Sequence, residues 1–258
     1  ELECMPRLQA KLPAQVLRTR FFRVAGMPES EVDQLIAPVY TRYTNPACTI
    51  LAAAGDIQVH LRARCATPEE AESLLDEVGS QIIALLGDRL YSRDGRPLEA
   101  CIGSLLQEAG QSLCVAESCT GGLLAGRITE IPGSSNYFQG GFLTYTSEAK
   151  RQLLGVSSDL LDRHTAVSSQ VAEAMAAGAR EKLRSDYALS VTGIAGPDGG
   201  TDAIPVGTVF IGLADSQGVS STRFQFMRDR TWVRTLAVNA ALDLLRMRLL
   251  SRNQRQAS

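Results

Sequence analysis

One serine lies in a sequence context that could make it a nucleophile. The apolar run 113–116 predicts a short buried strand, and apolar residues recur at helical spacing from Leu123 onward. The segment 118–122 between them reads Ser-Cys-Thr-Gly-Gly. A tight turn between a strand and a helix places a side-chain hydroxyl beside unpaired backbone N–H groups, and the start of a helix favours negative charge. The alternative is an ordinary turn in which Ser118 only caps the helix.

Three more segments carry polar groups at the ends of predicted strands. Tyr145 lies at the end of a strand predicted over 141–146, and Lys150 follows that strand. The glycine-rich segment 192–200 follows another apolar run, and Arg230 precedes the last predicted helix. If these strands are roughly parallel, their carboxyl ends converge on one crevice, the usual ligand position in open α/β sheets.

Ser118 needs a base, and Lys150 is the best-placed candidate. Neither histidine, His60 or His164, lies in one of these turns, and His164 falls between two predicted helices. The macrodipole at a helix start disfavours a cation, and partial burial would lower the pKa of Lys150 further. Both effects favour the neutral amine that a general base requires. Tyr145 could relay a proton or hold the lysine; the alternatives are a solvated lysine and an ordinary strand tyrosine.

Two other nucleophiles compete with Ser118. Cys119 lies at the same helix start, where the pKa of a thiol is lowered, but adjacent side chains should point in different directions. The pair Ser134 and Ser135 resembles that of serine–serine–lysine amidases without their flanking glycine-serine pattern. The Ser-x-x-Lys spacing of penicillin-recognising enzymes is absent, because Gly121 stands three positions after Ser118.

The segment 193–200 contains four glycines and one proline, which is more than a turn requires. Glycines let the backbone approach a phosphate or a sugar closely. No Gly-Lys-Ser/Thr follows, so the segment is not a Walker loop. Arg230 could bind a phosphate or carboxylate with two hydrogen bonds, the alternative being a surface arginine.

Residues 1–95 predict a small α+β module without catalytic groups. Apolar periodicity, turn residues and helix-capping residues define its elements. The expected order is a strand at 16–24, a helix at 29–39, a hairpin of 49–54 and 57–64, and a helix from 67 to about 86. His60 is interpreted as a structural or surface histidine.

The polar segment 92–97 is the expected linker to a second domain that spans 96–258. Helices and strands alternate along this domain and end in a hairpin of 206–214 and 219–226, followed by a long amphipathic helix from Thr231. This order predicts an α/β fold, specifically an α/β/α layered domain with a mixed sheet.

Composition excludes several classes of function. The net charge of −2 provides no excess of positive charge for binding nucleic acid or an anionic membrane. No apolar run approaches the length of a membrane span. Without a secretory leader, a cytoplasmic protein is expected. The 6 cysteines have no CxxC spacing and are read as reduced thiols, and with 2 histidines no metal site is expected. The chain begins at Glu1 without a methionine and could be part of a longer protein.

Several long motifs together resemble one family. They are Ala116-Glu117-Ser118-Cys119-Thr120-Gly121-Gly122, Pro132-Gly133-Ser134-Ser135, Tyr145 with Glu148-Ala149-Lys150, residues 192–200 and Pro205-Val206-Gly207-Thr208-Val209. Roughly residues 98–250 closely resemble the C-terminal domain of CinA-type competence/damage-inducible proteins. Residues 1–95 are similar to the K-homology-like middle module of those proteins, and residues 1–5 to the end of a preceding molybdopterin-binding-like domain.

The resemblance implies a nicotinamide mononucleotide (NMN) deamidase of pyridine nucleotide salvage. This reaction converts the carboxamide to nicotinic acid mononucleotide and ammonia, without a metal or cofactor. The resemblance makes Ser118 the nucleophile and Lys150 the base, with Tyr145 and Thr192 in the catalytic site. The substrate-binding residues that it implies are Thr120, Gly121, Gly122, Ser134, Gly193, Gly196 and Arg230. The expected partners are the nucleotide, other copies of the chain, and an N-terminal domain in the full-length protein.

Two positions depart from the family pattern. Arg228 stands where a glycine is usual, and Ile204 where a lysine commonly precedes Pro-Val-Gly-Thr. Arg228 could narrow the site or add a phosphate contact, and either change could weaken activity. One alternative is therefore a catalytically silent nucleotide-binding or regulatory module. Another is RNA or protein binding by residues 1–95, where near-neutral charge and the lack of a GxxG loop argue against RNA.

Overall fold

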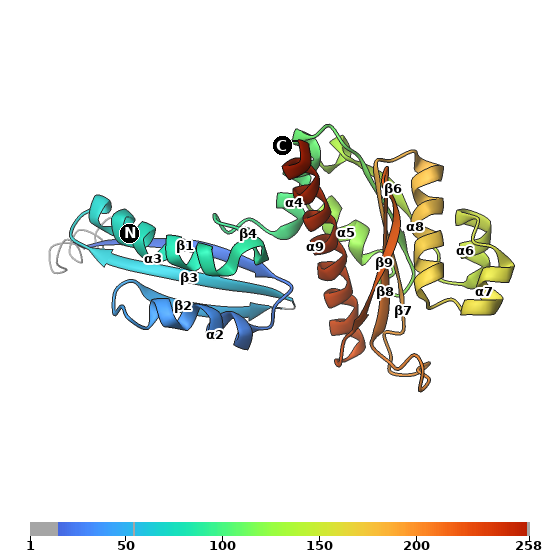
Figure 1. The fold of residues 1–258 in the computed structure, drawn as a ribbon, viewed down its shortest axis with the longest axis horizontal. Coiled ribbons are helices and arrows are strands. Elements are labelled where there is room, and N and C mark those ends of the chain that lie inside the picture. Colours follow the sequence, from blue (N-terminus) through green and yellow to red (C-terminus); the bar gives the residue numbers. More distant parts are fainter. Residues whose placement is uncertain (1–14, 54, 257–258) are drawn as a thin grey trace, which may run out of the picture. The chain divides into compact units, whose positions relative to one another are not determined.

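The structure is a computed structural model that describes residues 15–53 and 55–256, with side chains up to residue 252. The chain divides into two compact units, Glu1–Pro97 and Leu98–Ser258 (Figure 1). Each unit contains a hydrophobic core of its own. The boundary between them lies at the end of the polar segment 92–97.

The N-terminal unit is an antiparallel sheet covered by two helices. Its elements are β1 (Val16–Ala25), α2 (Glu29–Tyr40), β2 (Ala47–Ala53), β3 (Asp56–Cys65), α3 (Pro68–Leu86) and β4 (Leu90–Ser92). The strand order is β2-β3-β1-β4, and all the neighbouring strands are antiparallel. The predicted α+β module and its order of elements are confirmed.

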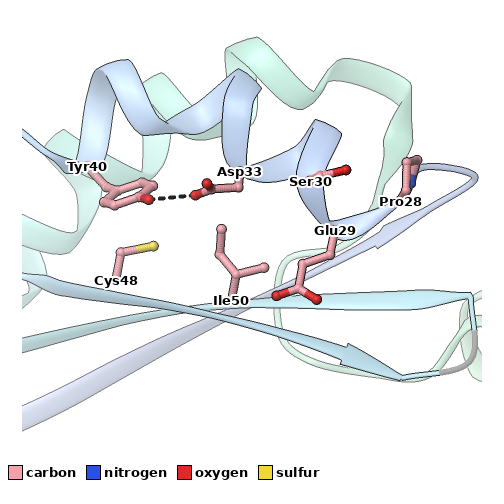
Figure 2. A pocket seen from close by; sticks show the side chains of 7 residues that line it. All are labelled: Pro28, Glu29, Ser30, Asp33, Tyr40, Cys48 and Ile50. Carbon is pink, nitrogen blue, oxygen red and sulfur yellow. Dashed lines mark hydrogen bonds between the residues drawn. The ribbon is translucent and has the colours of Figure 1, made fainter.

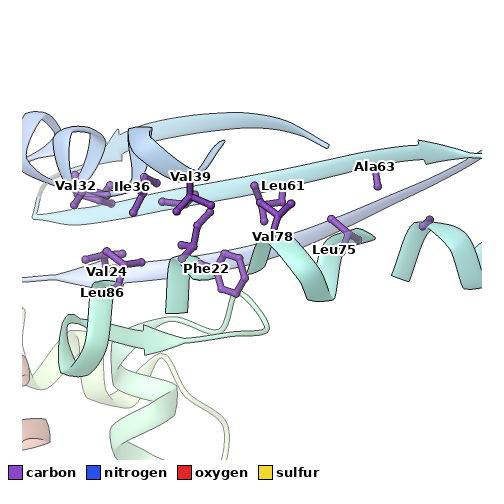
Figure 3. Close-up of a cluster of buried hydrophobic side chains, with 14 residues drawn as sticks. Phe22, Val24, Val32, Ile36, Val39, Leu61, Ala63, Leu75, Val78 and Leu86 are labelled. Atoms are coloured by element: carbon purple, nitrogen blue, oxygen red, sulfur yellow. The ribbon is translucent and has the colours of Figure 1, made fainter. Parts of the chain in front are cut away.

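Alternate residues of the strands form the floor of this unit's core. Val59 and Leu61 of β3 are fully buried, and His60 between them is only half-buried. Ile36 of α2 and Val78 of α3 pack into the same cluster as these strand residues (Figure 3). Both helices therefore cover one face of the sheet, as the single apolar side of each strand requires.

The C-terminal unit is a five-stranded mixed sheet with helices on both faces. Its strands are β5 (Leu113–Glu117), β6 (Phe138–Leu143), β7 (Tyr187–Gly193), β8 (Thr208–Asp215) and β9 (Gly218–Gln225), in the order β6-β5-β7-β8-β9. Its helices are α4 (Leu98–Glu108), α5 (Leu123–Thr129), α6 (Ser147–Leu154), α7 (Ser158–His164), α8 (Ser169–Leu183) and α9 (Arg230–Gln256). β5, β6 and β7 are parallel, and β8 is antiparallel to β7 and β9.

The helices form two layers, one on each face of this sheet. Val171 and Met175 of α8 pack against Cys114 and Ala116 of β5 in one cluster. α9 lies on the opposite face together with α4 and α5 (Figure 1). The predicted α/β/α layering with a mixed sheet is therefore confirmed. Within the described residues, no helix combines the length and the apolar character that a membrane span needs.

The predicted bounds of one strand and the predicted position of His164 are wrong in this unit. β6 spans Phe138–Leu143 instead of 141–146. It ends early because Thr146 turns away from the sheet to cap α6, its hydroxyl accepting the N–H of Ala149 at 3.1 Å. His164 does not lie between helices but ends α7. That helix is short, and its apolar residues Leu160 and Leu161 alone give no clear helical period.

Candidate active site

The sheet topology brings four strand ends to one edge of the C-terminal unit. β5, β6 and β7 are parallel, so Glu117, Leu143 and Gly193 end at the same edge. β9 runs in the same direction as β7, because each is antiparallel to the β8 strand between them. The segment that leads from β9 to Arg230 therefore starts at this edge too. The predicted convergence of strand ends is confirmed, and it defines the candidate active site.

Ser118 and Lys150 meet at this edge as a buried pair. The Nζ of Lys150 lies 3.0 Å from the Oγ of Ser118. The exposed fraction of Ser118 is 8% and that of Lys150 is 1%. Nζ also donates to the backbone carbonyl of Thr144 at 2.7 Å. The two side chains, 32 positions apart in the chain, are thus in hydrogen-bond contact and shielded from solvent.

The surroundings of Lys150 favour its neutral form. Its polar partners are a hydroxyl and a carbonyl, and within the described residues no carboxylate accepts a hydrogen bond from it. Burial lowers the pKa of Lys150 from 10.5 to about 8, and the Cys119 thiol opposes this only in part. A neutral amine near pH 8 can accept a proton from the Ser118 hydroxyl, which is the chemistry of a general base.

The carboxylate of Glu117, the last residue of β5, caps the start of α5. It accepts the N–H groups of Gly122 at 3.0 Å, Leu124 at 3.1 Å and Ala125 at 2.9 Å. The side chain is 1% exposed. The positive end of this helix is therefore already neutralised from within the protein. The expectation that the helix start itself receives a ligand's negative charge is wrong for these three donors.

The turn before α5 has two more backbone donors, called open here because neither bonds to another of the described residues, although the N–H of Cys119 faces its own thiol. In the part of the chain that the structure describes, the N–H groups of Cys119 and Thr120 donate no hydrogen bond to another residue. They follow Ser118 directly, which is the position of an oxyanion hole in many acyl-transfer enzymes. Gly121 and Gly122 then take φ values of +60° and +94°, so the turn depends on residues without a Cβ.

Arg230 joins two of the converging loops. Its Nη1 donates to the carbonyl of Gly196 at 2.9 Å, and its Nη2 donates to the hydroxyl of Tyr145 at 3.1 Å. Tyr145 is 60% exposed. The predicted contact between Tyr145 and Lys150 is not seen, because the tyrosine hydroxyl is held by Arg230 and the lysine by Thr144.

The remaining predicted site residues, at the end of β7 and in the loop after it, have structural partners. Thr192 is fully buried, and its hydroxyl donates to the carbonyl of Ala166 at 2.7 Å. A Cβ at Gly193 would lie 2.7 Å from the backbone oxygen of Thr208, and one at Gly196 2.6 Å from Val206. These glycines are required by the packing of this loop on residues 206–208, which accounts for them without a ligand.

Comparison with known proteins decides the family of this chain. Residues 95–249 match the family described as "CinA C-terminal domain", and residues 19–92 match "Damage-inducible protein CinA KH domain". The chain belongs to the CinA family. A CinA-like protein of Solibacter usitatus is 55% identical over 254 residues, covering 98% of this chain and 61% of the relative. A CinA-like protein of Koribacter versatilis is 41% identical over 248 residues, covering 96% of this chain and 60% of the relative.

Solved structures of the CinA superfamily share the fold of one part of the chain. The competence/damage inducible protein of Agrobacterium tumefaciens is 42% identical, with a TM-score of 0.57, covering 59% of this chain and 93% of that one. The CinA superfamily protein of Escherichia coli is 36% identical, with a TM-score of 0.56, covering 58% of this chain and 88% of that one. The chain spans about three fifths of the length of the curated CinA relatives that it matches.

Ser134 does not lie at the candidate active site. It belongs to a short 3-10 turn (Ser134–Asn136) before β6, and β6 begins beside Leu113 at the start of β5. Ser118 follows the other end of β5. The prediction of Ser134 as a substrate contact, and of the 134–135 pair as a rival nucleophile, is therefore not supported, because a motif close in sequence lies at the opposite edge of the sheet.

Cys119 is a poor nucleophile in this environment. Burial raises the pKa of its thiol to about 11, and the nearby cations Lys150 and Arg234 only reduce that rise. A thiol with this pKa carries little thiolate at neutral pH. Arg228, which departs from the CinA pattern, has its guanidinium 5.9 Å from the ring centroid of Trp232. That contact accounts for its position without a second phosphate contact.

The N-terminal unit has a separate hollow of about 650 Å³ between α2 and β2. It is lined by Pro28, Glu29, Ser30, Asp33, Tyr40, Cys48 and Ile50 (Figure 2). The Tyr40 hydroxyl donates to Asp33 at 2.6 Å. The carboxylates of Glu29 and Asp33 make this hollow unfavourable for a phosphate group. Within the described residues, no three His, Cys, Asp or Glu side chains gather as a metal site.

Proposed function

We propose that the C-terminal unit hydrolyses the carboxamide of NMN to nicotinic acid mononucleotide and ammonia. The buried contact between Ser118 and Lys150 is the observation that carries this proposal. A serine with a neutral amine at 3.0 Å, and two open N–H groups beside it, contains the parts that acyl transfer requires. The resemblance of the motifs to CinA deamidases supports the choice of substrate.

The first half of the reaction forms an acyl-enzyme. Neutral Lys150 accepts the hydroxyl proton as the Oγ of Ser118 attacks the carboxamide carbon. Negative charge develops on the carbonyl oxygen, where the N–H groups of Cys119 and Thr120 can receive it. The ammonium of Lys150 then returns its proton to the amide nitrogen, and ammonia leaves. The carbonyl of Thr144 keeps Nζ directed at the serine throughout.

The second half of the reaction releases the acid. Lys150 accepts a proton from a water molecule that attacks the acyl carbon, and it returns this proton to the Oγ of Ser118 as the ester bond breaks. The carboxylate product then leaves with its nucleotide. Arg230 and the loop 193–200 reach the same edge as Ser118, so they are the groups we assign to the anionic part of the substrate.

Ammonia release from NMN tests this function. We expect the wild-type chain to release ammonia and Ser118→Ala to release none above background. Calorimetry with NMN separates the alternative of a silent nucleotide-binding module, which would bind NMN without hydrolysis. Ammonia release by Ser118→Ala at the wild-type rate would remove the serine from the mechanism.

A further inference from the structure

The turn that carries Ser118 is held from three sides. The N–H of Ser118 donates to the carbonyl of Val191 in β7 at 2.9 Å. The carboxylate of Glu117 holds the start of α5. The third contact comes from α9, where Nη2 of Arg234 donates to the backbone carbonyl of Thr120 at 2.6 Å. This last contact joins residues 114 positions apart in the chain.

The guanidinium of Arg234 lies against the backbone of this turn. A Cβ at Gly121 would be 3.4 Å from Nη2. The Nε of Arg234 is buried and, within the described residues, has no hydrogen-bond partner, and the same holds for the buried hydroxyl of Thr120. Keeping a polar group from water without a partner costs on the order of 1–3 kcal/mol. A group that is packed at such a cost is expected to have a role where it lies.

The position of Arg234 bears on the two open donors. The carbonyl that it binds belongs to Thr120, whose N–H is one of these donors, and the other is the N–H of Cys119. Burial raises the pKa of the Cys119 thiol, and Arg234 is among the cations that oppose this rise. The guanidinium of Arg234 therefore lies against the backbone that carries these two donors.

One face of α9 holds the three loops of the site together. Arg230 and Arg234 are four residues apart, so they lie on the same side of the helix. Arg230 holds the loops after β6 and β7 through Tyr145 and Gly196. Arg234 holds the turn after β5 through Thr120.

We propose that Arg234 is a positioning residue that fixes the backbone of Thr120 through its carbonyl, so that the N–H groups of Cys119 and Thr120 converge on the oxyanion formed at Ser118. This inference rests on the proposed serine acyl chemistry, though not on NMN as the substrate. A guanidinium suits the role because its planar donors keep one orientation, whereas a lysine offers a single flexible ammonium.

Substitutions of Arg234 test the proposal in the full chain. Arg234→Met removes the charge and the donors, and we expect it to lower kcat for ammonia release by about 10- to 100-fold, part of the loss seen when one oxyanion donor is removed. KM should stay within about threefold. Arg234→Lys keeps the charge and one donor and should recover kcat to within about fivefold of wild type. Arg248→Met is the matched control, since Arg248 of the same helix pairs with Asp215 at 3.3 Å.

The pH profile separates positioning from general loosening of the turn. The hydrogen bonds of Lys150 go to Ser118 and Thr144, so the apparent pKa of kcat/KM should not move in Arg234→Met. A loosened turn would separate Ser118 from Lys150 and shift that pKa. The proposal is overturned by a kcat within twofold of wild type, by a loss confined to KM, or by a shifted pKa. If circular dichroism shows Arg234→Met to be unfolded, Arg234→Gln is judged by the same criteria.

Covalent labelling of Ser118 keeps this test apart from the choice of substrate. An ethoxyfluorophosphonate is attacked by an activated serine with loss of fluoride, and its phosphoryl oxygen needs the same donors as an oxyanion. The wild type could release no ammonia and still be labelled at Ser118. In that case the labelling rates of wild type and Arg234→Met are compared. Labelling of Arg234→Met that is at least tenfold slower supports the proposal, and equal rates reject it. No labelling of wild type, judged against Ser118→Ala by mass spectrometry, rejects the proposal together with the serine chemistry.

Discussion

The structure describes two lysine side chains, Lys150 and Lys182, and they differ in burial. Lys182 is exposed on α8, whereas Lys150 is 1% exposed and directed at a serine hydroxyl and a backbone carbonyl. Removing an ammonium from water without a carboxylate partner favours the neutral amine. At the scale of single residues, burial without a counter-charge is what turns this lysine into a candidate base.

The rate of ammonia release should depend on pH through Lys150. Below its pKa of about 8 the amine is protonated and cannot act as a base, so kcat/KM should rise with pH and level off above about 8. Lys150→Met should lower kcat by at least ~100-fold, the lower range for loss of a general base. Steady-state rates between about pH 6 and 10 measure both effects.

Lys182→Met is the matched control for this prediction and should keep the wild-type rate and profile. A profile of Lys150→Met that still rises through pH 8 would show that another group titrates.

Cys119 should be dispensable for turnover, although it adjoins Ser118. Its thiol is buried and its pKa is raised to about 11, so it is a weak nucleophile at neutral pH. Cys119→Ala keeps the backbone N–H, and we expect kcat within about threefold of wild type in the ammonia assay. An inactive Cys119→Ala, together with loss of wild-type activity on alkylation, would instead identify the thiol as the nucleophile.

At the scale of elements, the start of α5 depends on one acidic side chain from the preceding strand. Glu117 ends β5, and its carboxylate satisfies three N–H groups that would otherwise be unpaired at the helix start. The helix has 7 residues and cannot rely on its own length for stability. The geometry of the Ser118 turn thus depends on this cap.

Glu117→Gln should destabilise the C-terminal unit by about 1–3 kcal/mol, because one amide oxygen replaces two charged oxygens and the NH₂ group faces backbone donors. Urea unfolding followed by the fluorescence of Trp232, the single tryptophan of the chain, measures this unit alone. The control Glu148→Gln alters an exposed carboxylate in α6 and should leave the midpoint in place. Equal midpoints for the two variants would show that the cap adds nothing.

Much of this arrangement can be predicted from the sequence. Prediction of the remaining contacts fails for physical reasons. Apolar periodicity locates the strands, and the N-cap at Thr67 gives the start of α3, because both signals are local. The carbonyl of Thr144 could not be predicted as the partner of Lys150, since any backbone could supply it. Arg234 was missed for a related reason: its partner Thr120 lies in another element, and no local pattern marks that contact.

Some residues were placed in the site by motif and proved to have other surroundings. Ser134 lies near Ser118 in sequence, but a helix returns the chain to the opposite edge of the sheet before it. Gly193 and Gly196 are required by close packing, which a sequence cannot separate from close approach of a ligand. Sequence motifs therefore identified the edge of the sheet more reliably than the contacts made there.

At the scale of the whole molecule, each of the two units has buried apolar side chains of its own, and the proposed chemistry lies in only one unit. The residues from Ser118 to Arg234 that build the site all belong to the unit Leu98–Ser258. The unit Glu1–Pro97 has its own cluster of buried side chains and an acidic hollow instead. Stability and catalysis should therefore respond separately to changes in the two units.

The substitution Leu61→Ala tests whether the two units respond independently. Leu61 is fully buried in the N-terminal core, so its truncation should destabilise that unit by about 2–5 kcal/mol through lost burial and a cavity. The urea transition seen by far-ultraviolet circular dichroism should shift, while the Trp232 transition and kcat for ammonia release stay within error. Leu51→Ala, at a position 48% exposed in the same sheet, is the control and should change neither. A parallel fall in kcat would mean that the N-terminal unit positions the catalytic one, because the substitution lies outside every contact of the site.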